Sequence, residues 1–594
     1  MGLQRRAVYH PTPIGPPMCG IIGEISTAAP VDRARFDQRR DALAHRGPDG
    51  WGTRVVDSGR VAIGHRRLAV LDLSDAAAQP MSNLDDSVVL TFGGEIYNYR
   101  ELRAELRAAG HRFASQCDAE VVLHGYEQWG PGVVSRLNGM FAFGVYDATR
   151  RTLMLARDRL GIKPLYYAQT PTSFVFGSEL KAIISAPSVQ RTLNVDAVAD
   201  FLVHRFIPAP DTIWSGVHKL PPASLLLLKA DRADRANKVA IRKYWHLTPD
   251  VRRPADAAEE AAQRLEQVVA RQLVSDVPTG LLLSGGADSS ALAHFMHARN
   301  ITSSFSLGFE GWEKSEHRTA RQVAQRVGMS HHERIVPSLL DLLPRASQAF
   351  DEPLGGSSFL PTMALSEFAA EHITVALGGD GGDEVFGGYR WYAQAVKSGV
   401  RTRDVAAFYF DAMSWADLRY ADVRSLLSDS GAAQLSRHHD LWLYEPLVQH
   451  HLHPVRALQC LDLATFLPEV VLAKVDRASM AFGLEVRVPF LDHELVQWAL
   501  GLDMRTLMPR GSAKALLRGI PGVSEALGRP KQGFGSPVHR WLRSANDWQQ
   551  PLLTGPLVAS GLIRQPVLRQ WIAEGRVRPL WAVVILNQWA RQWL

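Results

Sequence analysis

The stretch LLLSGGADSS, Leu281 to Ser290, decides the fold of the second half of this chain. Its leucines are typical of a buried strand, and the residues around and after Asp288 are typical of a helix. Between them, Ser-Gly-Gly lets backbone N–H groups face outward at the helix N-terminus, where they bind anions. An acid among such donors is explained by a bound cation, and Mg²⁺ shared between a carboxylate and substrate phosphates is the usual case. A plain strand-to-helix turn is the alternative, but it leaves Asp288 unexplained.

Helices and short apolar strands alternate on either side of this stretch. Residues 256–275 have the spacing of an amphipathic helix, and residues 303–309 and 373–380 repeat the buried-strand pattern. This alternation predicts a doubly wound α/β domain with a parallel sheet. Beyond residue 400 the chain is rich in helical patterns with Trp and Leu, so we expect a helical C-terminal part.

The N-terminal third has a different character. Short runs of β-branched and aromatic residues follow one another between Gly, Pro and Asp, and helical periodicity is confined to residues 98–109 and 118–129. We therefore expect an α+β sandwich of antiparallel sheets. Prolines cluster where this pattern ends, and we place the junction there, with domains at 19–205 and 206–594.

The composition is that of a globular protein with at least two domains, because 594 residues exceed one core. The 66 basic and 60 acidic residues leave a formal charge of only +6, without a long basic run, which argues against a nucleic-acid partner. Three widely spaced cysteines exclude a disulfide scaffold and favour a reducing, cytoplasmic setting, and no apolar run approaches a transmembrane length. Residues 1–18 contain four prolines and lack the apolar core of a signal peptide, so we expect a leader that is disordered or removed.

Two motifs carry a resemblance to a known family. SGGADSS resembles the SGGxDS signature of ATP pyrophosphatases, which transfer AMP to an acceptor oxygen and release pyrophosphate. Residues 375–389, VALGGDGGDEVFGGY, are similar to the second acidic loop of glutamine-dependent asparagine synthetases, with Gly378 in place of a common Ser. The resemblance implies ATP, Mg²⁺ held by Asp288 and Asp383, and Asp380 beside an acyl-adenylate. It implies ATP contacts from two strands and their loops, namely Leu283, Ser284, Gly285, Gly286, Asp288, Ser289, Ser290, Leu307, Gly378 and Gly379.

Residues 472–492 and 529–537 are also similar to segments of this family. A cation is expected in such segments, because pyrophosphate and the pentacovalent phosphorus both build up negative charge. By resemblance, Lys531 is the candidate for stabilising the intermediate, and Lys474 and Arg487 are further candidates. For the last two, pairing with acids at a domain surface is an equally open explanation.

Met18 and Cys19 directly precede the first apolar strand. A cysteine in this position can be a small buried residue. The N-terminal half, however, resembles the class II glutamine amidotransferases of the Ntn-hydrolase type, in which an N-terminal Cys attacks the glutamine amide and its own α-amino group acts as base. A peptide nitrogen cannot act as base, because its lone pair is delocalised. We therefore expect Cys19 to become residue one, through initiation at Met18 and methionine removal or through cleavage of the leader.

Other stretches resemble the glutamine site of these amidotransferases, among them HRGPD at 45–49 and GHRRLAVLD at 64–72. The resemblance makes Arg67 the clamp for the substrate carboxylate, a task that suits the planar guanidinium fork. It makes Asp118 the acid that binds the glutamine α-amino group. An Arg and an Asp on separate segments suit the two ends of a zwitterion.

The stretch GGEIYN, residues 93–98, departs from the family pattern. It contributes Gly93 and Glu95 to the expected glutamine site, but the family normally has Asn where this chain has Gly93. The oxyanion hole then keeps only the backbone N–H of Gly94. Loss of one such donor typically costs about 10²–10³ in kcat. We predict a weakened glutaminase beside an intact synthetase that accepts free ammonia.

The resemblance implies a ligase in which ATP adenylates a carboxylate and ammonia from glutamine displaces AMP. L-Aspartate is the default acceptor, and the products would be asparagine, AMP, pyrophosphate and glutamate. Two glycines in residues 351–362, where a bulkier or acidic residue is expected, keep a sugar acid or natural-product acid as an alternative.

Two rival functions fit the sequence less well. A non-catalytic protein that binds ATP or glutamine would not need the acids and loop serines that are present. A tRNA-modifying pyrophosphatase would need a basic surface and cysteines near the loop, and this sequence shows neither. The partners expected are glutamine, ATP and the acceptor, without nucleic acid or membrane, and a homodimer stays an open option.

Overall fold

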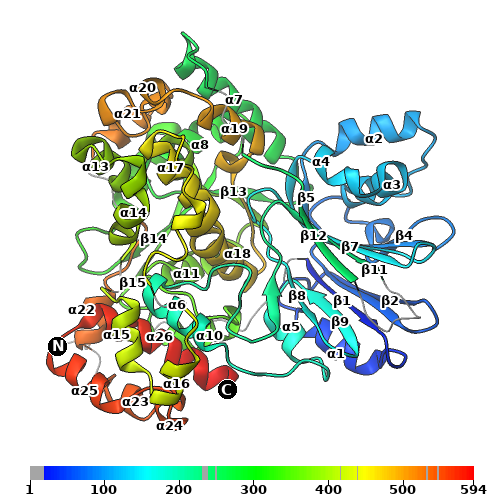
Figure 1. The fold of residues 1–594 in the computed structure, drawn as a ribbon. Coiled ribbons are helices and arrows are strands. Elements are labelled where there is room, and N and C mark those ends of the chain that lie inside the picture. The colour runs from blue at the N-terminus through cyan, green and yellow to red at the C-terminus, as the bar shows by residue number, and fades with distance from the viewer. Residues whose placement is uncertain are drawn as a thin grey trace, which may run out of the picture.

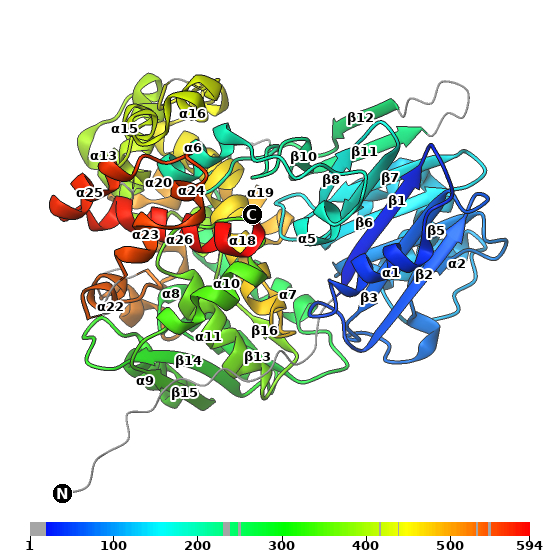
Figure 2. The same cartoon turned by 90° about the horizontal axis from the view of Figure 1, so that it is seen from below.

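The computed structural model describes residues 19–229, 238–247, 251–414, 417–437, 439–529, 533–544 and 548–594. The chain folds into two halves that lie side by side, one rich in strands and the other mostly helical around a single sheet (Figures 1 and 2). The expected leader, residues 1–18, lies outside the described residues.

The strand-rich half contains two six-stranded sheets, and every pairing within them is antiparallel. In spatial order, the first sheet consists of β10 (Val217–Lys219), β8 (Tyr166–Gln169), β9 (Ser173–Gly177), β1 (Gly20–Ser26), β3 (Val61–Arg67) and β2 (Gly50–Val56). The second consists of β12 (Lys238–Lys243), β11 (Ser224–Lys229), β7 (Thr152–Arg157), β6 (Gly139–Asp147), β5 (Val88–Ile96) and β4 (Met81–Ser82). The expected antiparallel sandwich is confirmed.

These sheets form the two inner layers of an αββα sandwich. Apolar side chains that alternate along β1 and β6, such as Ile21, Ile25 and Tyr146, meet in the core between the sheets. Helices α2 (Tyr99–Ala108) and α3 (Ala119–Trp129) cover the second sheet, and α1 (Arg33–Asp41) and α5 (Leu180–Ile184) cover the first (Figure 1). The two longer helices of this half lie where periodicity predicted them.

The sandwich extends beyond residue 205, the expected domain boundary. Strand β10 joins the first sheet through β8, and β11 and β12 extend the second sheet through β7. The proline cluster at 204–224 therefore lies within the sandwich and not at its end. Helix α6 (Val195–His204) packs instead with helices of the second half, so segments of the two halves alternate along the chain here. The boundary between 205 and 206 stays a prediction, and prolines mark irregular backbone inside a domain as well as between domains.

The second half is built on a five-stranded parallel sheet. Its strands, in spatial order, are β15 (Ser330–Val336), β14 (Ser303–Phe309), β13 (Thr279–Leu282), β16 (Val375–Leu377) and β17 (Glu485–Arg487). The chain order reverses between β13 and β16, so these two adjacent strands form the switch point of the sheet. In open α/β sheets this switch point is where ligands bind.

Amphipathic helices surround the parallel sheet. In α7 (Ala257–Gln272) the buried residues Ala261, Leu265, Val268 and Val269 recur at helical spacing, as the sequence predicted. Other long helices of this half are α6 (Val195–His204), α8 (Ala287–His297), α9 (His317–Val327), α11 (Phe359–Ala370), α13 (Arg390–Ser398), α14 (Val405–Met413), α17 (Pro454–Leu461), α18 (Ala473–Met480), α19 (His493–Leu500), α25 (Gln565–Ala573) and α26 (Val577–Trp593). The C-terminal helices α22 (Val538–Ser544), α23 (Gln550–Leu553), α24 (Pro556–Ala559), α25 and α26 gather at one end of the molecule (Figure 1). None of the helices within the described ranges is long and apolar enough to cross a membrane.

Candidate active site

The predicted phosphate loop connects β13 to α8. Gly286 is the N-cap of α8, and its N–H donates to the Ser284 hydroxyl over 3.2 Å, while that hydroxyl lies 3.1 Å from the Ser289 hydroxyl. Gly285 has φ +79°, and a Cβ there would lie 2.6 Å from Cγ2 of Thr319. The loop therefore needs glycine both for its conformation and for its approach to α9.

The loop after β16 packs against the phosphate loop. A Cβ on Gly379 would lie 3.0 Å from Cβ of Asp288, and one on Gly382 would lie 2.5 Å from its carboxyl carbon. Glycine at these positions lets the second loop reach the acid of the first. Gly378, which replaces the family's Ser, has its N–H bonded to the Arg487 carbonyl over 2.8 Å.

Two of the expected ATP contacts are buried leucines. Leu283 follows β13 and donates its N–H to the Phe305 carbonyl over 2.9 Å, and Leu307 lies on β14, the adjacent strand. Ser290 is buried in the first turn of α8. The structure thus brings the expected ATP residues together along two neighbouring strands and the two loops at the switch point.

Asp288 and Asp383, the expected Mg²⁺ ligands, point at the same place. Both carboxylates contact the ammonium of Lys514, which lies 2.6 Å from Oδ1 of Asp383 and is hydrogen-bonded to Oδ2 of Asp288. Two convergent carboxylates on facing loops are hard oxygen ligands of the kind that Mg²⁺ takes together with phosphate oxygens. The residues present therefore fit this ion.

Sequence reasoning missed Lys514. The side chain is buried, its backbone is left-handed with φ 51°, and the two carboxylates raise its pKa above the usual lysine range despite burial. Nothing in the surrounding sequence separates Lys514 from an ordinary surface lysine. Only the fold brings it to the carboxylates.

The candidates for stabilising the intermediate separate in space. Lys474, on α18, lies 3.7 Å from Oδ1 of Asp380 and is buried. Arg487 faces the other half of the protein, where it lies 2.6 Å from Glu485 and 3.3 Å from Glu95. For Arg487, pairing with acids at the domain interface is the better explanation. Lys531 lies outside the described residues.

Cys19 lies just before β1 and lines a cavity at the end of the sandwich. Its thiol sits between the backbone N–H and C=O of Leu68, at 3.5 and 3.7 Å. Burial raises the pKa of this thiol to about 12. At neutral pH the thiol is therefore protonated and needs a base before it can attack a substrate.

The Gly93-Gly94 pair lies on β5 opposite Cys19. Gly94 has φ +146°, and a Cβ there would lie 2.0 Å from the carbonyl oxygen of Met140, so no other residue fits. A Cβ on Gly93 would lie 3.5 Å from the Cys19 carbonyl oxygen and 3.7 Å from its Cβ, which are ordinary contacts. The backbone therefore leaves room for a side chain at Gly93 directed at Cys19.

The same cavity gathers the expected glutamine-binding groups. Arg67, Glu95 and Asp118 line it with Cys19 and Gly94. The Arg67 guanidinium is anchored by the carbonyls of Asp72 and Ser74, the latter at 3.0 Å. These groups come from distant parts of the sandwich, as the sequence predicted.

Two acids of this cavity, Asp118 and Glu95, have raised pKa values. Asp118 accepts the Ile96 N–H over 2.7 Å, and burial raises the pKa of its carboxyl to about 6. Burial and the nearby Glu485 raise the pKa of Glu95. Glu485 comes from β17 of the other half and lines the cavity as well. Sequence reasoning missed this residue, because a contribution across the domain interface leaves no local signal.

Comparison with known proteins matches each half of the chain to a family. Residues 18–245 match the family model described as a glutamine amidotransferase domain, and residues 260–591 match the one described as asparagine synthase. The chain belongs to the asparagine synthetase family. With that family it is an ATP-dependent amide-forming ligase.

Relatives of the synthetase match over most of its length. The glutamine-hydrolysing asparagine synthetase 1 of Bacillus subtilis is 30% identical over 96% of both chains. A putative glutamine-hydrolysing asparagine synthetase of Mycobacterium bovis is 30% identical over 96% of this chain and 97% of its own. A putative glutamine-hydrolysing asparagine synthetase of Methanocaldococcus jannaschii is 36% identical over 63% of this chain and 76% of its own.

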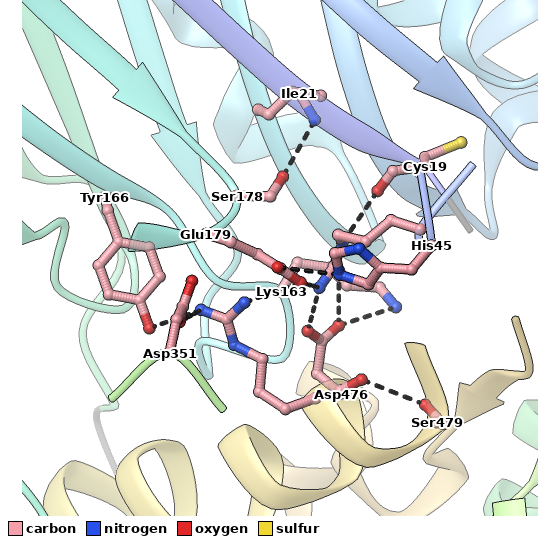
Figure 3. A network of polar contacts seen from close by, with 12 residues as sticks. Cys19, Ile21, His45, Lys163, Tyr166, Ser178, Glu179, Asp351, Asp476 and Ser479 are labelled. Carbon is pink, nitrogen blue, oxygen red and sulfur yellow. Dashed lines mark hydrogen bonds and ion pairs between the residues drawn. The ribbon is translucent and has the colours of Figure 1, made fainter. Parts of the chain in front are cut away.

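A buried polar network joins the two halves of the synthetase (Figure 3). Arg46 donates to Glu179 and to Asp476 of α18, both over 2.8 Å, and approaches the Cys19 carbonyl at 3.4 Å. Arg477, the neighbour of Asp476, lies 2.8 Å from the same Glu179 and 3.2 Å from Asp351. His45, Lys181 and Arg477 hold the pKa of Glu179 below its usual range although burial acts to raise it.

A small cavity of ≈ 40 Å³ lies beside this network, between the two halves. Strand residues of the sandwich line one side, including Tyr166, and Asp351, Asp476 and Arg477 line the other. The interface therefore contains empty space next to a rigid array of charges.

Proposed function

We propose that this protein forms an amide from a carboxylic acid, ATP and ammonia, with glutamine as the ammonia source, through an acyl-adenylate. The convergence of Asp288 and Asp383 at the switch point is the single observation that carries this proposal. Adenylation makes a poor electrophile reactive, because AMP is a far better leaving group than oxide.

In the adenylation step, the acceptor carboxylate attacks the α-phosphorus of ATP and pyrophosphate leaves. The N–H groups around Gly286 would bind phosphate oxygens, and Lys474 beside Asp380 would neutralise charge near the acyl-adenylate. Mg²⁺, held by Asp288 and Asp383, would supply charge neutralisation on the phosphates. Before the nucleotide binds, the Lys514 ammonium would offset the electrostatic repulsion between the two carboxylates.

In the glutaminase step, the Cys19 thiol attacks the glutamine amide. Its raised pKa of about 12 supports a mechanism in which the freed α-amino group of Cys19 takes the proton. Arg67 and Asp118 would bind the two ends of glutamine, and the Gly94 N–H would donate to the oxyanion. Without an amide at residue 93 this step would be slow.

Ammonia would pass through the protein interior. The cavity between the halves supports this route, because it lies beside the network that reaches from Cys19 to Asp351. An enclosed path would protect ammonia from protonation, which would remove its nucleophilicity.

L-Aspartate is the first acceptor to test, and another carboxylic acid is the second candidate. The experiment is ATP–pyrophosphate exchange with protein that begins at Cys19, followed by product analysis with free ammonia. Exchange that depends on L-aspartate, with asparagine and AMP as products, supports the first candidate. Growth of an asparagine auxotroph that expresses this gene is the matching test in cells, and the lack of exchange with any acid would refute the proposal.

A further inference from the structure

A polar cavity of ≈ 440 Å³ opens among the helices of the second half. Three arginines line it: Arg205 at the end of α6, Arg390 at the start of α13, and Arg578 on α26. Cavities of roughly 300–1,000 Å³ hold whole drug-sized ligands. This cavity thus has more room than a free amino acid needs.

The cavity is connected to segments that belong to the synthetase site. Arg390 directly follows Tyr389, the last residue of the second acidic loop. Ser357, from the acceptor-side stretch, and Ser536, from the segment that contains Lys531, both line the cavity, and the Ser536 hydroxyl donates to the Ser357 carbonyl over 2.7 Å. Two segments that the family resemblance assigns to the reaction therefore line this cavity, and a third ends next to Arg390.

Arg205 is held in the cavity at a conformational cost. It is buried and ends α6 in the left-handed region, with φ 65°, a position that glycine usually occupies. Gly355 donates its N–H to the Arg205 carbonyl over 2.8 Å, and a Cβ on Gly355 would lie 2.3 Å from Cβ of Arg205. The glycine at residue 355, where a bulkier residue was expected, makes room for this arginine.

The charge around the cavity is positive. Two carboxylates also line it, but Asp417 pairs with Arg578 at 3.3 Å, and Asp411 pairs with Arg419 at 3.0 Å. Burial, reinforced by Arg578, lowers the pKa of Arg205 to about 9. Burial of a cation costs hydration free energy, and pairing with an anionic ligand offsets part of that cost.

We propose that the arginine cavity, defined by Arg205, Arg390 and Arg578, binds the distal part of the acceptor, and that this acceptor is a small acid larger than aspartate with a second anionic group. The inference rests on the proposed function, because it assigns the substrate class of the same reaction. Arg205 and Arg390 bind the second anionic group, and the first carboxylate is adenylated near Asp380.

The test is ATP–pyrophosphate exchange with the full second half present and the chain starting at Cys19. The probes are L-aspartate, aspartyl-glycine and aspartyl-glycinamide, a dipeptide pair that differs in one distal charge, the C-terminal carboxylate. We expect the acidic dipeptide to show a KM at least about tenfold below that of the amide, the effect of one charge-assisted hydrogen bond. Arg390→Met and Arg205→Met should remove this difference and leave the KM for ATP unchanged.

The controls make each result informative. Arg390 is exposed, so Arg390→Met keeps the test valid if Arg205→Met does not fold. Arg569→Met on α25 is the matched control, because Arg569 lies outside the cavity. Equal KM values for the two dipeptides would overturn this inference. So would a protein that supports exchange with aspartate alone and whose exchange is the same after Arg390→Met. Either result would leave the proposed function standing. Absence of exchange with every acid would instead contradict the proposed function.

Discussion

Gly93→Asn should speed glutamine hydrolysis by supplying the oxyanion donor that the chain is predicted to lack. The family places an amide at this position, and in this protein a Cβ on residue 93 would make only ordinary contacts, 3.5 Å from the Cys19 carbonyl and 3.7 Å from Cβ of Cys19. The substitution thus adds a donor near the oxyanion without forcing the backbone to move. One oxyanion donor is worth about 10²–10³ in kcat in other hydrolases. We expect an increase of at least about tenfold.

The assay is glutamate release from glutamine by protein whose chain begins at Cys19. Gly93→Ala is the matched control, because it adds the same Cβ without the amide. Pyrophosphate release with free ammonia reports the synthetase half and should be the same in all three proteins. Glutamine hydrolysis by Gly93→Asn that is no faster than hydrolysis by Gly93→Ala would refute the reasoning about the oxyanion hole.

Four further predictions test separate parts of the account. Asp383→Asn should slow ATP–pyrophosphate exchange by at least about 10²-fold, since a metal clamp supplies several kcal/mol, and should leave glutamine hydrolysis unchanged. Gly94→Ala should lower the free energy of unfolding by about 1–3 kcal/mol or more, measured by urea titration, because its Cβ would lie 2.0 Å from the Met140 oxygen; unaltered stability would contradict this contact. Burial raises the pKa of Asp118 to about 6, so its carboxyl gains a proton and loses its charge as the pH falls below about 6. The KM for glutamine should therefore rise below this pH, and Asp118→Asn should show a high KM at every pH. A pH-independent KM in the parent would count against the assignment. Arg477→Met should destabilise the protein by about 3–5 kcal/mol, because it leaves Glu179 and Asp351 buried with fewer countercharges; a loss below 1 kcal/mol in thermal unfolding would show that the network contributes little.

The sequence predicted the fold well where one local pattern determines one element. Two of the leucines before SGGADSS, Leu281 and Leu282, lie in β13, and the spacing of buried residues in α7 follows the expected helix. The extent of the sandwich could not be predicted in this way. Strand β10 lies within the proline cluster and β11 and β12 follow it, and the place of β10 and β11 depends on pairing with β8 and β7, which are distant in sequence.

The candidate sites show the same division. Motifs identified Cys19, Asp288 and Asp383, because these residues stand in short stretches with a recognisable pattern. Lys514 and Glu485 carried no such pattern, and each reaches its site from a distant segment. Arg205 is a third case, since the glycine that accommodates it lies 150 positions away in the chain. Tertiary contacts of this kind leave no local trace in one sequence.

Transfer of ¹⁸O from a labelled acceptor carboxylate tests the central claim most directly. The measurement uses free ammonia, ATP and the acid that supports pyrophosphate exchange, with mass spectrometry of the nucleotide product. The account predicts one ¹⁸O atom in each AMP formed and none in pyrophosphate, because the carboxylate oxygen attacks the α-phosphorus and leaves with AMP. Unlabelled AMP, or label in inorganic phosphate with ADP as the product, would contradict it.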